Sequence, residues 1–202
     1  MTEGRRERKK LQTRQLLIDT AFRLFAEQGY QQTTVAQIAA EADVAKKTFF
    51  NHFPTKEDVL FADAGRFVEA AHEVIAAREP GEPIGDVLLK VYDHVLTQPP
   101  TAALPVPDAA VLDIAALART VPAVQAKALQ VMSELQDRVA TAFAEAFPDE
   151  LDPVTAGAAV GALIGAGQGA SMASLRLGHS LAEHLAGTRR ALDLVRDGLR
   201  TL

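Results

Sequence analysis

Residues 33–56, TTVAQIAAEADVAKKTFFNHFPTK, predict two short helices joined by a tight turn. Thr34 and Gln37 have the spacing of a capping box, in which each side chain caps the backbone N–H of the other residue. The apolar residues that follow recur at i, i+3, i+4 and i+7 and so line one helix face: Val35, Ile38, Ala39 and Ala42. Asp43 and Val44 form the predicted turn, because aspartate tolerates a left-handed backbone better than most residues.

The second helix is predicted over residues 46–52, with Phe49 and Phe53 turned inward. The side chains left on its outer face are of the kinds that bind DNA phosphates and base edges: Lys46, Lys47, Thr48 and Asn51. A helix this short can place its N-terminal half in a major groove. The stretch is therefore interpreted as a DNA-binding helix-turn-helix. Side chains at the helix ends are predicted to contact phosphates: Thr33, Thr34, His52 and Lys56.

The pattern V-x-x-I-A-x-x-A-x-V-x-x-x-T-x-F-x-H-F-P-x-K over residues 35–56 resembles the DNA-binding signature of the tetracycline-repressor (TetR) family of bacterial regulators. The likeness covers roughly residues 10–60 and includes F-x-x-x-G-Y at residues 25–30. The family usually has Gly where this chain has Asp43, Ser at Ala45 and Tyr at Phe50. Ala45 removes an N-cap worth about 1 kcal/mol. Phe50 lacks the hydroxyl that family members often direct at a phosphate, so it is left out of the predicted polar contacts.

The resemblance implies an all-α fold with two domains. A three-helix DNA-binding domain is expected at residues 1–56, and a six-helix ligand-binding and dimerisation domain at residues 57–202. It also implies a homodimeric repressor that is released from a palindromic double-stranded DNA operator by a small apolar effector. The alternative is a helix-turn-helix regulator without a small-molecule inducer, controlled by a protein partner or by its own abundance.

Charge is unevenly distributed along the chain. The net charge is −5, yet residues 1–56 hold ten Lys and Arg against six Asp and Glu. A basic N-terminal domain on an acidic remainder is the charge distribution of a protein that binds nucleic acid through one domain. The basic run at residues 5–10 is either a solvated tail or an arm that binds phosphates or the minor groove.

Helix periodicity continues to the end of the chain, and no strand pattern is present. A helix over residues 9–28 is expected to end at Gly29. A continuous helix over residues 55–78 would link the two domains as a lever of about 35 Å. Further helices are predicted at residues 84–96, 108–119, 123–147, 153–177 and 180–201, with a proline-rich loop at 98–107.

Residues 154–175 carry no charge and are long enough to span a membrane. Their Gly- and Ala-rich composition argues against a span, and four glycines spaced every four residues favour close helix packing within the domain or between subunits: Gly157, Gly161, Gly165 and Gly169. No unbroken apolar stretch follows the basic N-terminus, so no secretory signal is predicted. We expect a cytoplasmic protein without a membrane partner.

The second domain carries an apolar stripe and a set of candidate ligand contacts. The stripe on the last helix predicts a homodimer joined by the last two helices: Leu181, Leu185, Leu192, Val195 and Leu199. Bulky or polar residues on otherwise apolar faces are the candidate ligand contacts, although each also fits an ordinary core position: Phe67, Tyr92, His94, Met132, Gln168 and Met172. His179 and His184 flank the start of the last helix and fit either a solvated position or an interface that titrates near neutral pH.

Other classes of site find little support. Glu69, His72 and Glu73 lie within one helical turn, but this spacing is common by chance, so no metal site is predicted. A hydrolase built on Ser171 or Ser174 would need a nucleophile elbow, and neither this nor a phosphate-binding glycine loop is present. The chain has no cysteine, which excludes disulfides and thiolate ligands. We therefore expect no catalytic residue and no cofactor.

Overall fold

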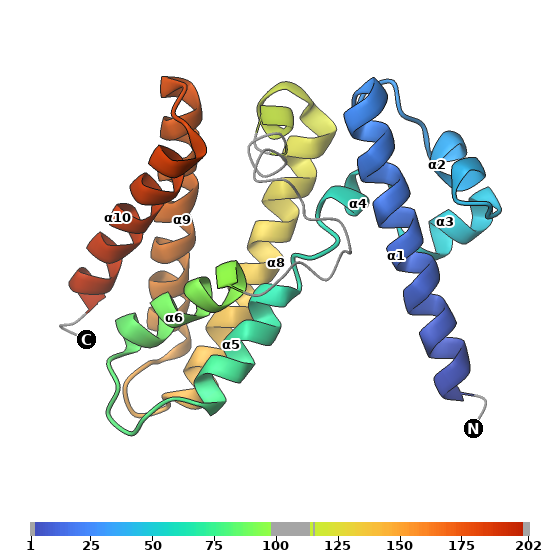
Figure 1. Ribbon diagram of the computed structural model, residues 1–202. Helices are drawn as coiled ribbons and strands as arrows, with labels where there is room; N and C mark the ends of the chain where they lie inside the picture. Colours follow the sequence, from blue (N-terminus) through green and yellow to red (C-terminus); the bar gives the residue numbers. More distant parts are fainter. Residues whose placement is uncertain (1–2, 98–113, 115, 200–202) are drawn as a thin grey trace. The chain divides into compact units, whose positions relative to one another are not determined.

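A computed structural model describes residues 3–97, 114 and 116–199, which form helices and no strand (Figure 1). Contacts between residues divide the described chain into two compact units, with the boundary between Ala62 and Asp63. We call residues 3–62 the head and the described residues from 63 onward the body. The proline-rich loop predicted at residues 98–107 and the start of the helix predicted at 108 lie outside the described residues.

The head consists of α1 (Glu3–Gln28), α2 (Val35–Glu41), α3 (Lys46–His52) and the short α4 (Glu57–Leu60). α1 ends as predicted, since Gly29 follows with a φ of 85°, which glycine adopts without strain. Its start lies earlier than the predicted residue 9. Residues from all four helices form one apolar core: Leu17, Ile18, Ala21, Ile38, Phe49 and Val59. Val59 is fully buried in this core, which explains why α4 belongs to the head.

The body contains α5 (Arg66–Ala76), α6 (Ile84–Thr97), α8 (Pro122–Ala146), α9 (Pro153–Leu177) and α10 (Leu181–Leu199). α9 packs against α8 and α10, while α5 packs against α6 and α8 (Figure 1). Asp152 caps α9 by accepting from the backbone N–H groups of Val154 and Thr155 at 2.7 and 3.0 Å. The body core is apolar and includes Val87, Leu88, Phe143, Val160 and Leu192.

The prediction of a continuous helix over residues 55–78 is wrong. α4 ends at Leu60 and α5 begins only at Arg66, so a segment of turns separates them. Within it, the Ala62 N–H bonds to the carbonyl of Val59, three residues back rather than four. Gly65 lies in this segment, and an interior glycine costs a helix about 1 kcal/mol relative to alanine. The chain therefore has no rigid lever at the boundary between head and body.

α9 has few neighbours along its glycine-rich face. A Cβ on Gly161 would lie 2.9 Å from the side chain of Gln136 in α8, whereas Cβ atoms on Gly157, Gly165 and Gly169 would meet nothing within 4 Å. Close packing within the body is thus found at one of the four positions. Among the described helices, α9 is long and apolar enough to cross a membrane by length and composition, a criterion that core helices of soluble proteins also meet.

Candidate nucleic-acid interface

The first helix of the helix-turn-helix begins with the predicted capping box. The Gln37 N–H donates to the Thr34 hydroxyl at 3.2 Å, and the Thr34 N–H donates to the Gln37 side chain at 2.8 Å. The turn after α2 places Asp43 at a φ of 51°. The Val44 N–H then donates to the carbonyl of Ala39 at 2.9 Å, which closes the turn. Local hydrogen bonds therefore fix where α3 begins.

α3 buries its aromatic face and exposes its polar face. Phe49 and Phe53 are 0% and 2% exposed. Lys46, Lys47 and Asn51 are exposed, and Thr48 is half-buried. This arrangement leaves three donor side chains free to approach a groove, because the buried rings hold the helix against the head core. We regard this outward face as the candidate base-reading surface.

Phe50 belongs to the same outward face, although it was omitted from the predicted contacts. Its side chain is 46% exposed and its ring meets that of Phe49 edge to face, with centroids 5.7 Å apart. The exposure of Phe50 could have been predicted from helical geometry, because adjacent residues point about 100° apart and Phe49 occupies the core. An exposed aromatic here adds an apolar element to an otherwise polar surface.

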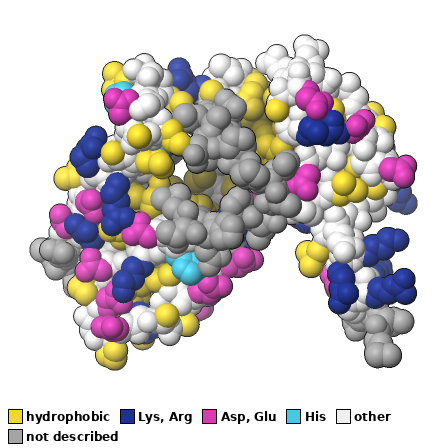
Figure 2. Space-filling view, in the orientation of Figure 1, with side chains coloured by type: hydrophobic (Ala, Val, Ile, Leu, Met, Phe, Trp, Pro, Cys, Tyr) yellow, Lys and Arg dark blue, Asp and Glu magenta, His cyan; other side chains and the backbone are white. Residues whose placement is uncertain are grey.

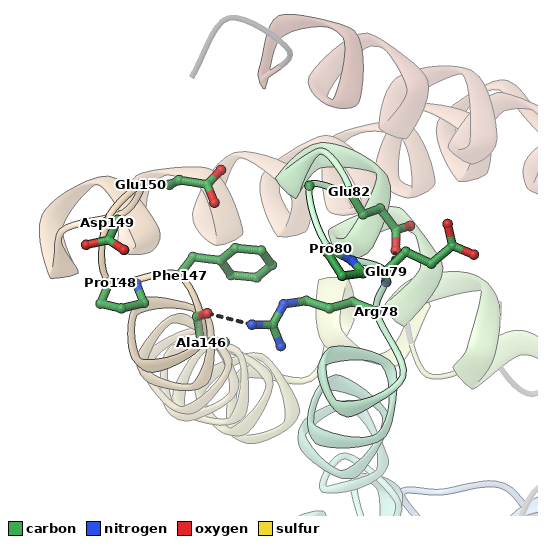
Figure 3. A pocket seen from close by; sticks show the side chains of 10 residues that line it. Arg78, Glu79, Pro80, Glu82, Ala146, Phe147, Pro148, Asp149 and Glu150 are labelled. Carbon is green, nitrogen blue, oxygen red and sulfur yellow. Dashed lines mark hydrogen bonds between the residues drawn. The ribbon is translucent and has the colours of Figure 1, made fainter.

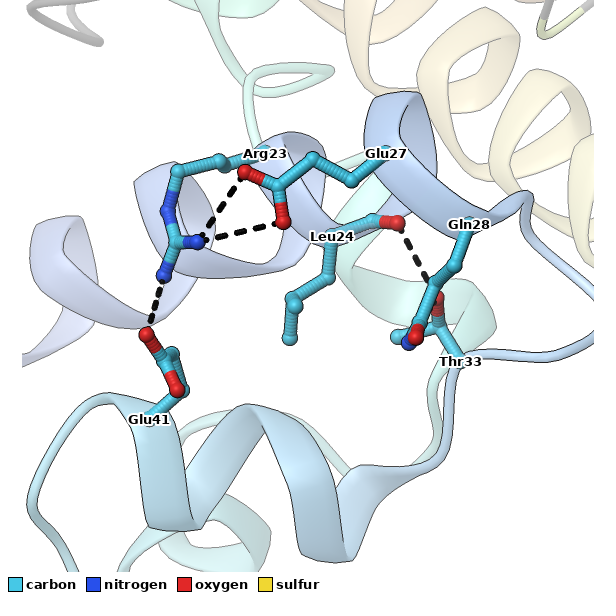
Figure 4. Close-up of polar contacts among 6 residues, drawn as sticks. All are labelled: Arg23, Leu24, Glu27, Gln28, Thr33 and Glu41. Atoms are coloured by element: carbon cyan, nitrogen blue, oxygen red, sulfur yellow. Dashed lines mark hydrogen bonds and ion pairs between the residues drawn. The ribbon is translucent and has the colours of Figure 1, made fainter.

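Thr33 is buried in the head and Lys56 is half-buried, and both bond to backbone carbonyls. The Thr33 side chain is 1% exposed and donates to the carbonyl of Gly29 at 2.9 Å; it also lies 3.3 Å from the carbonyl of Leu24 (Figure 4). Lys56 Nζ donates to the carbonyls of Tyr30 and Thr33, both at 2.8 Å. Burial lowers the pKa of Lys56. Both side chains therefore bond to the loop between α1 and α2.

Further polar contacts join the parts of the head. The Tyr30 hydroxyl donates to Glu57 of α4 at 2.6 Å, and burial raises the pKa of this tyrosine. On the surface, Arg23 of α1 bonds to Glu27 and to Glu41 of α2, the latter at 2.8 Å (Figure 4). Exposed pairs such as these contribute little stability individually. Of these two pairs, only Arg23–Glu41 joins α1 to α2.

His52 and Thr34 remain accessible at the helix ends. His52 is half-buried, and its burial together with the nearby charges of Arg14 and Lys10 lowers its pKa. A lowered pKa favours the neutral imidazole at pH 7 in the free protein. Thr34 is exposed, with its hydroxyl shared with Gln37.

Comparisons with known proteins agree with this geometry. Residues 17–62 match the family model described as bacterial regulatory proteins, tetR family. The transcriptional regulator TcmR of Streptomyces glaucescens is 33% identical over 150 residues, which cover 74% of this chain and 66% of TcmR. The chain belongs to the TetR family. AcrR of Shigella flexneri is 35% identical over 89 residues, covering 42% of this chain and 40% of AcrR. The curated relatives are regulators rather than enzymes, in agreement with the prediction.

Solved structures share the fold of this TetR-family chain. GusR of Salmonella enterica superposes with a TM-score of 0.54 at 22% identity, covering 95% of this chain and 97% of GusR. The repressor FadR of Thermus thermophilus, in complex with lauroyl-CoA, superposes with a TM-score of 0.53 at 22% identity, covering 89% and 92%. At this level of identity the likeness concerns the fold alone.

The candidate ligand residues of the body differ in their burial. Phe67 and Tyr92 pack against the body core, and burial raises the pKa of Tyr92. His94 bonds to Glu73 at 2.8 Å. Gln168 is exposed, Met172 is 50% exposed and Met132 is half-buried. Within the described residues, no group of three His, Cys, Asp or Glu is arranged to hold a metal.

A pocket of about 460 Å³ lies elsewhere in the body, where the α5–α6 and α8–α9 connections meet (Figure 3). Arg78 lies over the ring of Phe147 at 4.7 Å and donates to the carbonyl of Ala146 at 2.9 Å. The rim is acidic, with Glu79, Glu82, Asp149 and Glu150. None of the six candidate ligand residues lines it. Arg78 uses its donors on carbonyls, so its described role is to hold these connections together.

The structure also places two buried polar groups on α10. His184 is 6% exposed and Thr188 is 4% exposed. Within the described chain, the Nδ1 atom of His184 and the hydroxyl of Thr188 have no hydrogen-bond partner. The expectation of a solvated or interfacial His184 therefore differs from the structure, in which the body itself buries the ring. By contrast His179 is exposed, with Nδ1 3.0 Å from the Ser174 hydroxyl.

Proposed function

We propose that this TetR-family protein is a transcriptional repressor that binds a palindromic DNA operator as a homodimer in the cytoplasm. The outward face of α3 carries this proposal. Lys46, Lys47 and Asn51 project from a helix whose start is fixed by local hydrogen bonds and whose opposite face is buried. Lysine and asparagine donate to guanine and adenine edges in the major groove.

The proposal of a homodimer rests on the small number of base pairs that one head can contact. A single short helix contacts only a few base pairs, so a specific site requires two heads about 34 Å apart. Apolar side chains remain exposed on α9 and α10: Met172 (50%), Leu177 (68%), Leu185 (43%) and Leu194 (76%). A second copy that covers part of this apolar surface would remove that part from water.

The predicted dimer stripe on α10 is only partly available for that interface. Leu192 is 1% exposed in the body core, and Val195 and Leu199 pack against the same core. Leu185 is the exposed member. Leu194 is also exposed, but it lies nine residues further on and so about 180° around the helix. The proposed interface therefore combines Leu185 with the exposed part of α9.

We further propose that a small apolar effector binds the body and releases the DNA. The FadR structure contains lauroyl-CoA, whose acyl chain is such an apolar group. A preference of about 2.7 kcal/mol for the state that cannot bind DNA would shift the equilibrium a hundredfold. Because the helix breaks between Leu60 and Arg66, the effect would pass through a segment of turns rather than a rigid lever. The alternative is control by a protein partner or by abundance.

The proposal is tested by selecting duplexes from fragmented genomic DNA with the purified protein. We expect a palindromic site, and sedimentation at micromolar concentration should give about twice the chain mass of 21.6 kDa. A stable monomer, or enrichment of no sequence, would refute it. If acyl-CoA esters of increasing chain length leave operator affinity unchanged, control by a partner or by abundance becomes the better account.

A further inference from the structure

The N-terminal part of α1 is a helix rather than an extended arm. α1 begins at Glu3, and the side chains of residues 4–12 are exposed. Five of them are basic: Arg5, Arg6, Arg8, Lys9 and Lys10. A helix with its side chains is about 10 Å wide, whereas the minor groove of B-DNA is about 6 Å wide. This segment, which we call the basic extension, is therefore too wide to lie in a minor groove while it is helical.

One side of the basic extension borders the end of α3. Arg14 marks this side, because its guanidinium lies 4.7 Å from the ring of Phe53, which follows α3, and donates to the carbonyl of Ala62 at 3.0 Å. Lys10 and Arg6 precede Arg14 by four and eight residues, which places them about 40° and 80° around the helix from Arg14. The charges of Lys10 and Arg14 also lower the pKa of His52 in α3.

The basic extension differs from the paired arginines of the body. In the body, Arg189 pairs with Asp93 and Arg196 pairs with Asp193, so their charges are compensated inside the unit. In the basic extension, no Lys or Arg forms an ion pair or side-chain hydrogen bond with another described residue. Figure 2 shows Lys and Arg side chains gathered beside the start of α1. Uncompensated positive charge next to a base-reading helix matches the charge of a DNA backbone.

We propose that Arg6 and Lys10 bind phosphates of the operator outside the segment that α3 contacts. The inference rests on the proposed function, because it requires that α3 bind DNA. Eight residues of helix separate Arg6 from Arg14, a length of about 12 Å, which corresponds to three or four base pairs along the duplex. Each head thereby contacts backbone flanking its half-site, which adds affinity without adding sequence preference.

Two matched double variants test the proposal. Arg6→Gln with Lys10→Gln removes the side that borders α3. Arg5→Gln with Lys9→Gln removes the same charge from positions about 100° around the helix from their neighbours in the first pair. All four side chains are exposed, so neither variant should change the unfolding temperature. Affinity for the selected duplex is measured across salt concentrations, with flanks extending a full helical turn beyond the site. The first variant should reduce the salt slope by about 1.8 per subunit and the second should leave it nearly unchanged.

The outcomes separate this inference from the function itself. If the wild-type protein selects no duplex, the proposed function fails. If it binds and both variants reduce the slope equally, the basic extension acts as diffuse charge, and the inference is overturned. If neither variant changes the slope, the basic extension is a solvated tail, which overturns it as well. Exchanging A·T for G·C pairs in the flanks should leave wild-type affinity unchanged, and a loss would reveal a minor-groove contact instead.

Discussion

The head and the body are both helical. The helix ends of the head are fixed by residues close in sequence, whereas helices of the body meet through residues far apart in sequence. In the head, the Thr34–Gln37 capping box and the positive φ of Asp43 and Gly29 fix helix ends through neighbouring residues. In the body, α6 and α10 meet through contacts such as that of Arg189 with Asp93, which are 96 residues apart. Short-range signals are visible in a sequence, whereas distant pairings are not. The head should therefore keep its fold when exposed residues are substituted and unfold when residues of its small core are substituted.

The largest effect is expected from Phe49→Ala. Phe49 is 0% exposed in a core that is much smaller than that of the body, and removing a buried phenylalanine costs about 3–5 kcal/mol. The head should unfold and DNA binding should disappear, while the helices of the body remain. Circular dichroism and a DNA-binding assay measure the two effects. Phe50→Ala serves as the control, because that side chain is 46% exposed and its loss should leave the fold intact.

A smaller effect is expected from Lys56→Met, which separates a structural from a phosphate-binding role. The variant removes the donor to the carbonyls of Tyr30 and Thr33, at a cost of roughly 1–3 kcal/mol to the head. Thermal unfolding should show this loss. The salt slope of DNA binding should stay unchanged, whereas Lys46→Met should reduce it by about 1 per subunit. A reduced slope in Lys56→Met would mean that its ammonium leaves the loop to bind a phosphate.

The smallest expected effect is the pH dependence of the stability that His52 contributes. The pKa of His52 is lowered from its ordinary value of 6.5 by burial and by the charges of Arg14 and Lys10, so the unfolded state takes up a proton first as the pH falls. The stability that His52 contributes is complete above pH 6.5 and decreases as the pH falls through that value towards the folded pKa. Denaturant unfolding at several pH values should show this decline, and His52→Gln should reduce it. If the stability of the His52→Gln variant declines with falling pH as much as that of the wild type, the assignment of this decline to His52 is wrong.

The sequence predicted most of the helices because their signals are local. α9 has the predicted bounds, since Asp152 caps its start and Gly178, with a φ of 69°, ends it. The break between α4 and α5 was missed because apolar periodicity runs through it. Val59 packs in the head core and Val68 in the body core, and a pattern of spacing cannot show that two neighbouring segments belong to different cores.

The candidate site was predicted in part. Lys46, Lys47 and Asn51 are exposed as expected, because burying Phe49 and Phe53 turns the opposite face outward. The contacts of Thr33 and Lys56 within the head were not predicted, because their partners are backbone carbonyls, which have no signature in the sequence. The candidate ligand residues of the body depend on distant packing, for which helix periodicity carries no information.

The central claim is that the outward face of α3 contacts operator bases, and Lys47→Ala and Asn51→Ala test it most directly. Affinity for the selected duplex is measured for each variant, with Lys127→Ala on α8 as a control of equal charge change for Lys47. Each variant in α3 should weaken binding by about 1–3 kcal/mol, or roughly 5- to 150-fold, with an unchanged unfolding temperature and no effect from the control. Wild-type affinity in both folded variants would contradict the claim.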